Sequence, residues 1–164
     1  MRIIVTDANV LINLVHVDRL DLLGRIPAHE FVVPDHVREE LTAPGGRERL
    51  DDAIRSGTLK LELLEDLDTI SVFVDLIRYI GRGEAACIAL AAKHGWSIAS
   101  DEKRRFRREV LARLGEGRII GTPDVFVLAI RAGLVTSDDA DADKGVLEQH
   151  RFKMTFASFR DLVQ

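Results

Sequence analysis

Short runs of β-branched and other apolar residues alternate along this chain with stretches whose apolar residues recur at helical spacing. This alternation is typical of an α/β domain with a mainly parallel sheet, because parallel strands need long crossovers, usually helical, between them. It constrains the fold more than any single residue does. We expect strands at Ile3 to Thr6, Phe31 to Val33, Leu59 to Leu63, Ser97 to Ala99 and Arg118 to Ile120.

Proline and glycine mark the expected helix ends. Pro34 favours a helix start, since a proline lacks the N–H that the first turn leaves unpaired, and "APGG" stops this helix after Leu41. The pair Thr122 and Pro123 repeats the start signal, and Ser137 is a candidate cap for a helix reaching Gln149.

Residues 66–80 predict another helix, with Ile70, Val74 and Ile77 on one apolar stripe. Core packing is the favoured role of this stripe. A homodimer contact or a surface for a partner protein is the alternative.

Length and composition favour one compact domain that spans residues 1–164, because 46% of its 164 residues are hydrophobic. The net charge of −4 argues against a protein that coats nucleic acid generally, although it allows a local basic face.

Cys87 is the only cysteine, which excludes an intrachain disulfide and suits a reducing cytoplasm. No apolar run approaches the roughly 20 residues of a membrane span, and "MRIIV" is too short for a signal-peptide core. We therefore expect a cytoplasmic protein without a membrane partner.

Two acids follow predicted strands. Asp7 comes directly after "IIVT", and Asp101 comes directly after "SIAS". In an open α/β sheet the carboxyl ends of the strands form the crevice where ligands bind. If the two strands are neighbours, these two carboxylates converge at one edge.

The segment "VREEL" offers a third acid at either Glu39 or Glu40. At about 100° per residue, Val37 and Leu41 define the buried stripe of this helix. Glu40 falls at the border of the stripe, whereas Glu39 points away from it. We choose Glu40 as the inward acid, and a border glutamate that reaches out to water is the alternative.

Glu84 opens the helix "EAACIALAAKHG". The partial positive charge of a helix N-terminus stabilises a carboxylate there by roughly 0.3–1 kcal/mol, so a favourable first-turn residue is one reading. The small side chains at Ala85, Ala86, Ala89 and Ala92 would let this helix approach the sheet closely and carry Glu84 toward the same crevice.

Four carboxylates gathered from separate segments would repel one another and raise each other's pKa unless a cation neutralised them. Ligands that are all oxygen atoms favour Mg²⁺ or Mn²⁺, and no paired His or Cys at metal-ligand spacing competes with them. Such a metal site supports phosphodiester hydrolysis, because it activates water and stabilises charge on the phosphate.

These segments together resemble the PIN-domain ribonucleases. The matching stretches, in chain order, are "VTDANVLINL", "VPDHVREEL", "GRGEAACIALA", "SIASDEKR" and "IIGTPDVFVLAIRAGLV". The resemblance implies a three-layer α/β/α sandwich with a central, mainly parallel sheet. It also implies a metal-dependent endoribonuclease acting on RNA, often the toxin of a toxin–antitoxin pair and therefore the partner of an antitoxin protein.

Carried over by position, the resemblance makes Asp7, Glu40, Glu84 and Asp101 the catalytic acids. Asp7, Glu84 and Asp101 would bind the Mg²⁺ or Mn²⁺, and Glu40 would position or deprotonate the attacking water. Asn9 and Ser100 match accessory polar positions. A Glu replaces the more usual Asp at position 84, a departure shared by a subset of the family with the same Gly-Glu-Ala motif.

A basic segment follows the fourth acid directly, and Phe106 and Val110 predict which face of its helix is buried. The exposed arginines are either a solvated surface or contacts for RNA phosphates, since Arg binds phosphate in a bidentate manner. They are Arg104, Arg105, Arg107 and Arg108.

Two other functions compete with the nuclease. A phosphatase of the haloacid-dehalogenase type also places an Asp after its first strand, but it normally has a second Asp two residues later, where this chain has Asn9. A PIN-like binding module without turnover is the other alternative, and the presence of all four acids argues against it.

Overall fold

The computed structural model describes residues 1–164 and contains one sheet of five parallel strands. The strand order is β3-β2-β1-β4-β5, so the first strand lies at the centre. The strands are β1 (Arg2–Thr6), β2 (His29–Pro34), β3 (Lys60–Glu62), β4 (Ser97–Ala99) and β5 (Ile119–Ile120). The predicted α/β class and the parallel sheet are confirmed, with strand boundaries that differ by at most two residues at either end.

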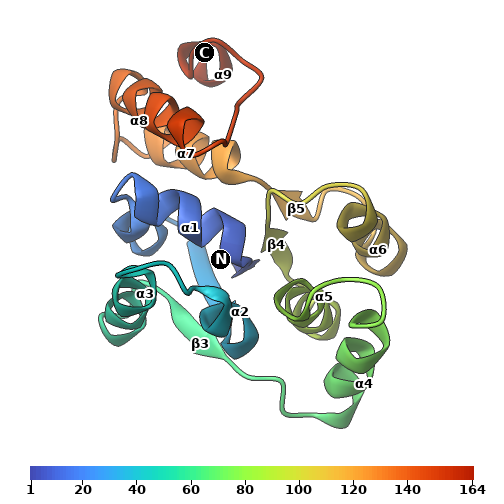
Figure 1. Cartoon of the computed structure of the whole chain (residues 1–164). Helices are drawn as coiled ribbons and strands as arrows, with labels where there is room; N and C mark the ends of the chain where they lie inside the picture. Colours follow the sequence, from blue (N-terminus) through green and yellow to red (C-terminus); the bar gives the residue numbers. More distant parts are fainter.

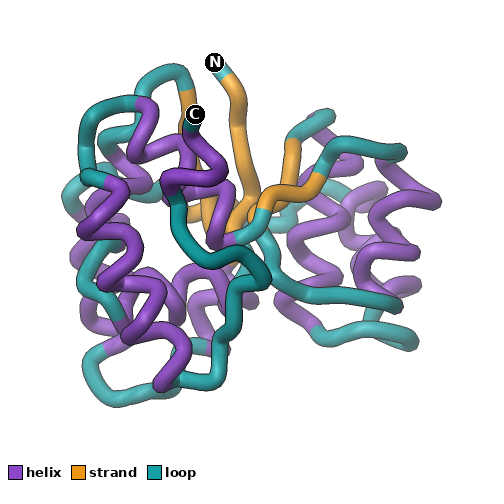
Figure 2. The backbone as a smooth tube through the Cα atoms, turned by 90° about the horizontal axis from the view of Figure 1, so that it is seen from above, coloured by secondary structure: helices purple, strands orange, loops and turns teal.

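Helices cover both faces of the sheet, as the tube in Figure 2 shows from above. One layer contains α4 (Leu67–Leu76), α5 (Arg82–His94) and α6 (Arg105–Leu114). The other contains α1 (Ala8–His16), α3 (Gly46–Arg55), α7 (Thr122–Arg131) and α8 (Ser137–Gln149) (Figure 1). The three-layer α/β/α sandwich is therefore confirmed.

Three short elements complete the chain. The helix α2 (Asp35–Glu40) follows β2 and contacts α5, α1 and α3. A 3-10 helix, η1 (Leu20–Gly24), connects α1 to β2, and α9 (Arg160–Val163) packs on α7. None of the helices is long and apolar enough to cross a membrane.

The central strand carries an unbroken apolar run because helices bury it on both faces. Ile4 and Val5 are completely buried, and α5 packs across β1, β2 and β4. Ala85, Ala86 and Ala89 are buried as expected and allow this close approach, whereas Ala92 is exposed near the end of the helix. The tight packing fixes the position of the α5 N-terminus relative to the sheet.

The predicted apolar stripe of α4 is wrong by one position. Thr69, Phe73 and Leu76 face the core, whereas Val74 is 52% exposed. A side-chain hydrogen bond explains why a threonine is on the inner face: Asp66 caps the helix and accepts from the Thr69 N–H and hydroxyl at 2.9 and 2.6 Å. The threonine is thus buried with its polar atoms paired, which a count of apolar residues does not anticipate.

Candidate active site

The two strands that precede Asp7 and Asp101 are neighbours. β1 pairs with β4 in parallel, with Thr6 opposite Ala99, and the Asp7 N–H donates to the Ala99 carbonyl at 2.9 Å. The adjacency that the sequence argument assumed is therefore present. Both acids lie at the carboxyl edge of the sheet, where parallel α/β folds place their ligands.

Asp7 caps the N-terminus of α1 and is only 2% exposed. Its Oδ1 accepts from the Ala8 N–H at 2.8 Å, and its Oδ2 accepts from the Ser100 hydroxyl at 3.1 Å. Burial raises the pKa of Asp7 to about 6 against these two hydrogen bonds, and the charges of Glu40 and Glu102 raise it further. The site therefore holds a buried carboxylate that keeps its charge only at a free-energy cost.

Glu40 is exposed, like Glu39, but its carboxylate turns toward the N-terminus of α5. Its Oε1 accepts from the Gly83 N–H at 2.8 Å. A Cβ added at Gly83 would lie 2.5 Å from this oxygen, so the carboxylate occupies the space that any larger residue would need. Gly83 is therefore required by the approach of Glu40.

Glu84 lies in the first turn of α5 among the other acids. Burial raises the pKa of Glu84 to about 7, and the negative charges of Asp7, Glu102 and Glu40 raise it further. A side chain at a helix N-terminus would by itself have a lowered pKa. The opposite direction found here shows that burial, together with the neighbouring negative charges, outweighs the effect of the helix terminus on the pKa of Glu84.

Asp101 is at the same edge, but its carboxylate accepts hydrogen bonds from the first residue of α7. Oδ1 accepts from the Thr122 N–H at 2.7 Å, and Oδ2 accepts from the Thr122 hydroxyl at 2.5 Å and from Asn13 Nδ2 at 3.2 Å. Burial raises its pKa, and the acid that adds to this effect is Asp124. Asp101 thus holds the beginning of α7 in place.

Glu102 joins the cluster although the sequence argument did not select it. Its charge raises the pKa of both Asp7 and Glu84, and its Oε1 accepts from Asn9 Nδ2 at 3.0 Å. Side chains alternate along an extended segment, so Ser100 and Glu102 share a side that Asp101 does not. This alternation is the signal that would have identified Glu102.

The two accessory polar residues join the loops that carry the acids. Asn9 also accepts from the Asp101 N–H at 3.1 Å through its Oδ1. Ser100 is fully buried, and its hydroxyl accepts from the Glu102 N–H at 3.1 Å while it donates to Asp7. The start of α1 and the segment after β4 are therefore fixed to each other by side chains.

The charge of the acidic cluster is not balanced by any basic side chain. Eleven ion pairs form elsewhere in the chain, but none of them involves Asp7, Glu40, Glu84, Asp101 or Glu102. Buried acids without a counter-ion are either protonated or neutralised by a bound cation.

The donor set suits Mg²⁺ or Mn²⁺, since it consists of oxygen atoms alone. The side chains are not arranged as a finished metal site, because no group of three or more His, Cys, Asp or Glu is placed to hold an ion.

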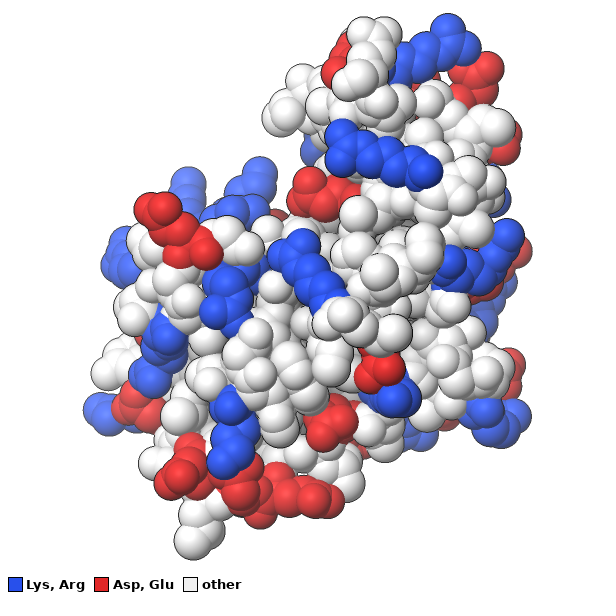
Figure 3. Space-filling view, turned by 180° about the vertical axis from the view of Figure 1, so that it is seen from behind, with Lys and Arg blue, Asp and Glu red and all other residues white.

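The predicted basic helix lies beside these acids. Phe106 and Val110 of α6 are 1% exposed, which confirms the predicted buried face. Figure 3 shows Lys and Arg side chains gathered over the side of the molecule that α6 occupies. Two of the four arginines contact backbone carbonyls: Arg105 Nη1 donates to Tyr79 at 3.0 Å, and Arg107 Nε donates to Glu102 at 3.2 Å.

A protein-family model matches most of this chain. A search of curated proteins finds none that is similar to this chain. A sequence model of the PIN domain matches residues 3–155, a range that includes all five acids and every strand of the sheet except Arg2 at the start of β1. Because the match covers nearly the whole chain, this protein belongs to the PIN-domain family.

Proposed function

We propose that this protein is an endoribonuclease that depends on Mg²⁺ or Mn²⁺ and hydrolyses phosphodiester bonds of RNA. PIN domains are in general metal-dependent nucleases that act on RNA. The observation that carries the proposal is the cluster of acids at the carboxyl edge, in which the pKa values of Asp7 and Glu84 are raised and no acid has a basic partner. A bound divalent cation would remove the free-energy cost of keeping these groups charged.

We assign Asp7, Glu84 and Glu102 to the metal. The charge of Glu102 raises the pKa of both other acids, and the charge of Asp7 raises the pKa of Glu84. Asp101 was expected to be a ligand, but three donors from Thr122 and Asn13 already hold its carboxylate, against two at Asp7. We therefore assign it a positioning role. The bound cation would lower the pKa of a coordinated water and stabilise the negative charge that develops on the phosphate.

Glu40 is the candidate group for orienting the attacking water and accepting its proton. Its carboxylate is fixed by the Gly83 N–H through one oxygen, and the other oxygen has no protein donor. A carboxylate held in this way keeps one oxygen free to accept a hydrogen bond from water, as a general base must. The exposed Arg104, which precedes α6, is the candidate for a contact to a phosphate beside the cleaved bond.

The test is cleavage of a single-stranded RNA with Mn²⁺, with EDTA, and by Asp7→Asn in Mn²⁺. We expect cleavage only by the parent protein with metal, and products that carry a 5′-phosphate and a 3′-hydroxyl, because water attacks phosphorus without help from a 2′-hydroxyl. Asp21→Asn is the matched control, since Asp21 is an exposed acid in η1. Equal cleavage in EDTA, or by Asp7→Asn, would refute the proposal.

A binding module without turnover is the second candidate, because the acids are not preassembled into a metal site. The same experiment separates the two functions: the module binds RNA and leaves it intact with Mn²⁺. The phosphatase alternative loses support from the family assignment. The role as a toxin with an antitoxin partner, and the homodimer, stay predictions, and co-purification with the product of a neighbouring gene would test the first.

A further inference from the structure

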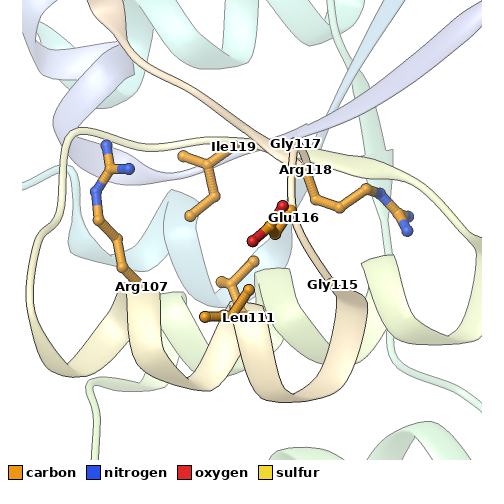
Figure 4. Close-up of a pocket in the computed structure, with 8 residues that line it drawn as sticks. Arg107, Leu111, Gly115, Glu116, Gly117, Arg118 and Ile119 are labelled. Atoms are coloured by element: carbon orange, nitrogen blue, oxygen red, sulfur yellow. The ribbon is translucent and has the colours of Figure 1, made fainter.

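An open groove of about 450 Å³ lies between helix α6 and the segment that leads into β5 (Figure 4). The end of the groove that Arg107 lines adjoins the acidic cluster, because Arg107 Nε donates to the backbone carbonyl of Glu102. The end of the groove that Arg118 lines reaches the opposite edge of the sheet, because Arg118 donates to the carbonyl of Trp96, the residue before β4. The groove therefore runs beside α6 from one edge of the sheet to the other.

The charges in the groove favour an anionic occupant. Figure 4 shows Arg107 and Arg118 on opposite sides of Leu111, Glu116 and Ile119. Glu116 is the only acid among the lining residues. The charged lining residues are therefore two arginines and one glutamate, a net charge of +1, although the whole chain has a net charge of −4.

Arg107 has hydrogen-bond donors that no protein atom uses. Arg107 uses only Nε within the protein, and its two terminal nitrogens have no protein acceptor. Arg118 differs, because both of its terminal nitrogens bind backbone carbonyls, those of Leu114 and Trp96. Arg107 is thus able to bind a phosphate in a bidentate manner, whereas Arg118 contributes its charge from a fixed position.

The floor of the groove is apolar. Val110 is buried, Ile119 is partly buried, and Leu111 is 54% exposed at the centre. An anion-binding groove for small ions alone does not need an apolar floor. A floor of this kind between two cationic ends matches a nucleic-acid strand, which presents phosphates at intervals and sugar and base surfaces between them.

We propose that this groove binds a segment of single-stranded RNA that continues from the acidic cluster, with one phosphate on Arg107 and the sugars and bases against Leu111. The proposal rests on RNA being the substrate and extends the site from the point of cleavage along α6. The rise of about 1.5 Å per residue gives about 12 Å between Arg107 and Gly115 along the helix, so the groove holds a short stretch of strand.

The test is the affinity of a fluorescent single-stranded RNA, measured in EDTA over a range of salt concentrations. Arg107→Gln should weaken binding several-fold and reduce the salt slope by about 0.7, the value for one phosphate contact to a single strand. Glu116→Gln should strengthen binding, because it removes the only acid of the groove. Arg55→Gln on α3, which lies in the other layer, is the charge-matched control and should leave affinity unchanged.

Two further variants distinguish RNA binding in the groove from general electrostatic attraction of RNA to the basic surface. Arg108→Gln, the adjacent arginine outside the groove, should have a smaller effect than Arg107→Gln, and Leu111→Ser should weaken binding without changing the salt slope. Equal effects of Arg107→Gln and Arg108→Gln, or an unchanged affinity of Glu116→Gln, would overturn the proposal. An RNA affinity that none of the groove variants alters would instead fit a peptide-binding groove, and that result also overturns it.

The outcome for the groove is independent of the outcome for catalysis, because binding is measured without metal. A protein that cleaves RNA but shows no selective effect of Arg107 and Glu116 keeps its nuclease function and loses the groove. A protein that binds through the groove but never cleaves loses the proposed reaction instead. Thermal melting of each variant checks that the fold is intact.

Discussion

The Gly83 N–H donates to Glu40 Oε1 at 2.8 Å, and the same carboxylate fills the space where a Cβ of residue 83 would be. The contact joins the end of α2 to the first turn of α5 across 43 residues of sequence. It fixes the one predicted acid whose side chain is otherwise exposed to solvent.

Gly83→Ala should therefore displace Glu40 and reduce cleavage by at least an order of magnitude. The new methyl group would be 2.5 Å from Oε1, a distance that the side chain must relieve by moving away. Gly145→Ala is the matched control, because nothing lies within 4 Å of a Cβ there and Gly145 is inside α8. That control should keep full activity and gain roughly 0.5–1 kcal/mol of stability. Equal activity of the two variants would show that cleavage does not depend on this position of the Glu40 carboxylate.

Asp7→Asn should abolish metal-dependent cleavage and leave the metal-free protein as stable or more stable at pH 7. Since burial raises the pKa of Asp7 from 3.8 to about 6, keeping it ionised in the folded chain costs on the order of 3 kcal/mol. Asn keeps the shape and the acceptor for the Ala8 N–H, and it removes the charge. Urea unfolding in EDTA measures the free energy, and a marked loss of stability would contradict this account of the site.

The stability of the metal-free protein should fall as the pH rises from about 4 to about 7. The folded chain binds more protons than the unfolded chain in this range, because the pKa values of Asp7 and Glu84 are raised to about 6 and 7 from 3.8 and 4.5. Asp51, Asp66 and Asp141 have lowered pKa values, so their contribution is instead lost below this range. Urea unfolding at several pH values should show the fall in the parent and a smaller one in Asp7→Asn/Glu84→Gln. Saturating Mn²⁺ should flatten it.

Glu102→Gln and Asp101→Ala should have opposite signatures. Glu102 is exposed, so its substitution should weaken Mn²⁺ binding and cleavage while the free energy of unfolding changes little. Asp101→Ala leaves the Thr122 N–H, the Thr122 hydroxyl and Asn13 without their acceptor, which should cost about 1–3 kcal/mol or more of stability. Calorimetric titration with Mn²⁺ and urea unfolding measure both. If Asp101→Ala abolishes Mn²⁺ binding in a stable protein, Asp101 is a ligand after all.

Much of the fold was predictable from the sequence because a buried parallel strand has a local signature. Runs such as "IIVT" and "SIA" are short, apolar and β-branched, and they are separated by helical stretches of sufficient length for crossovers. The position of Asp7 and Asp101 at one edge followed from the direction of the strands. Only the adjacency of β1 and β4 had to be assumed, since strand order is set by long-range packing.

The parts that sequence reasoning missed depend on side-chain hydrogen bonds, one within a single helix turn and one between distant segments. Thr69 is on the inner face of α4 because Asp66 satisfies its hydroxyl, so the apolar period alone gave a face displaced by one residue. The proposed assignment of Glu102 rather than Asp101 to the metal depends on Thr122, about 20 residues further on, whose hydroxyl donates to Asp101. Such pairings leave no periodic pattern in the sequence.

Three of the site carboxylates are each placed at the beginning of a helix: Asp7 at α1, Glu84 at α5, and Asp101 at α7. Each helix N-terminus is equivalent to roughly half a positive charge, so the backbone supplies an attractive potential to this edge that no side-chain substitution removes. A variant that lost all its site acids would therefore retain an anion-attracting edge. The acids make this edge selective for cations, and without them the same scaffold should favour anions such as phosphate.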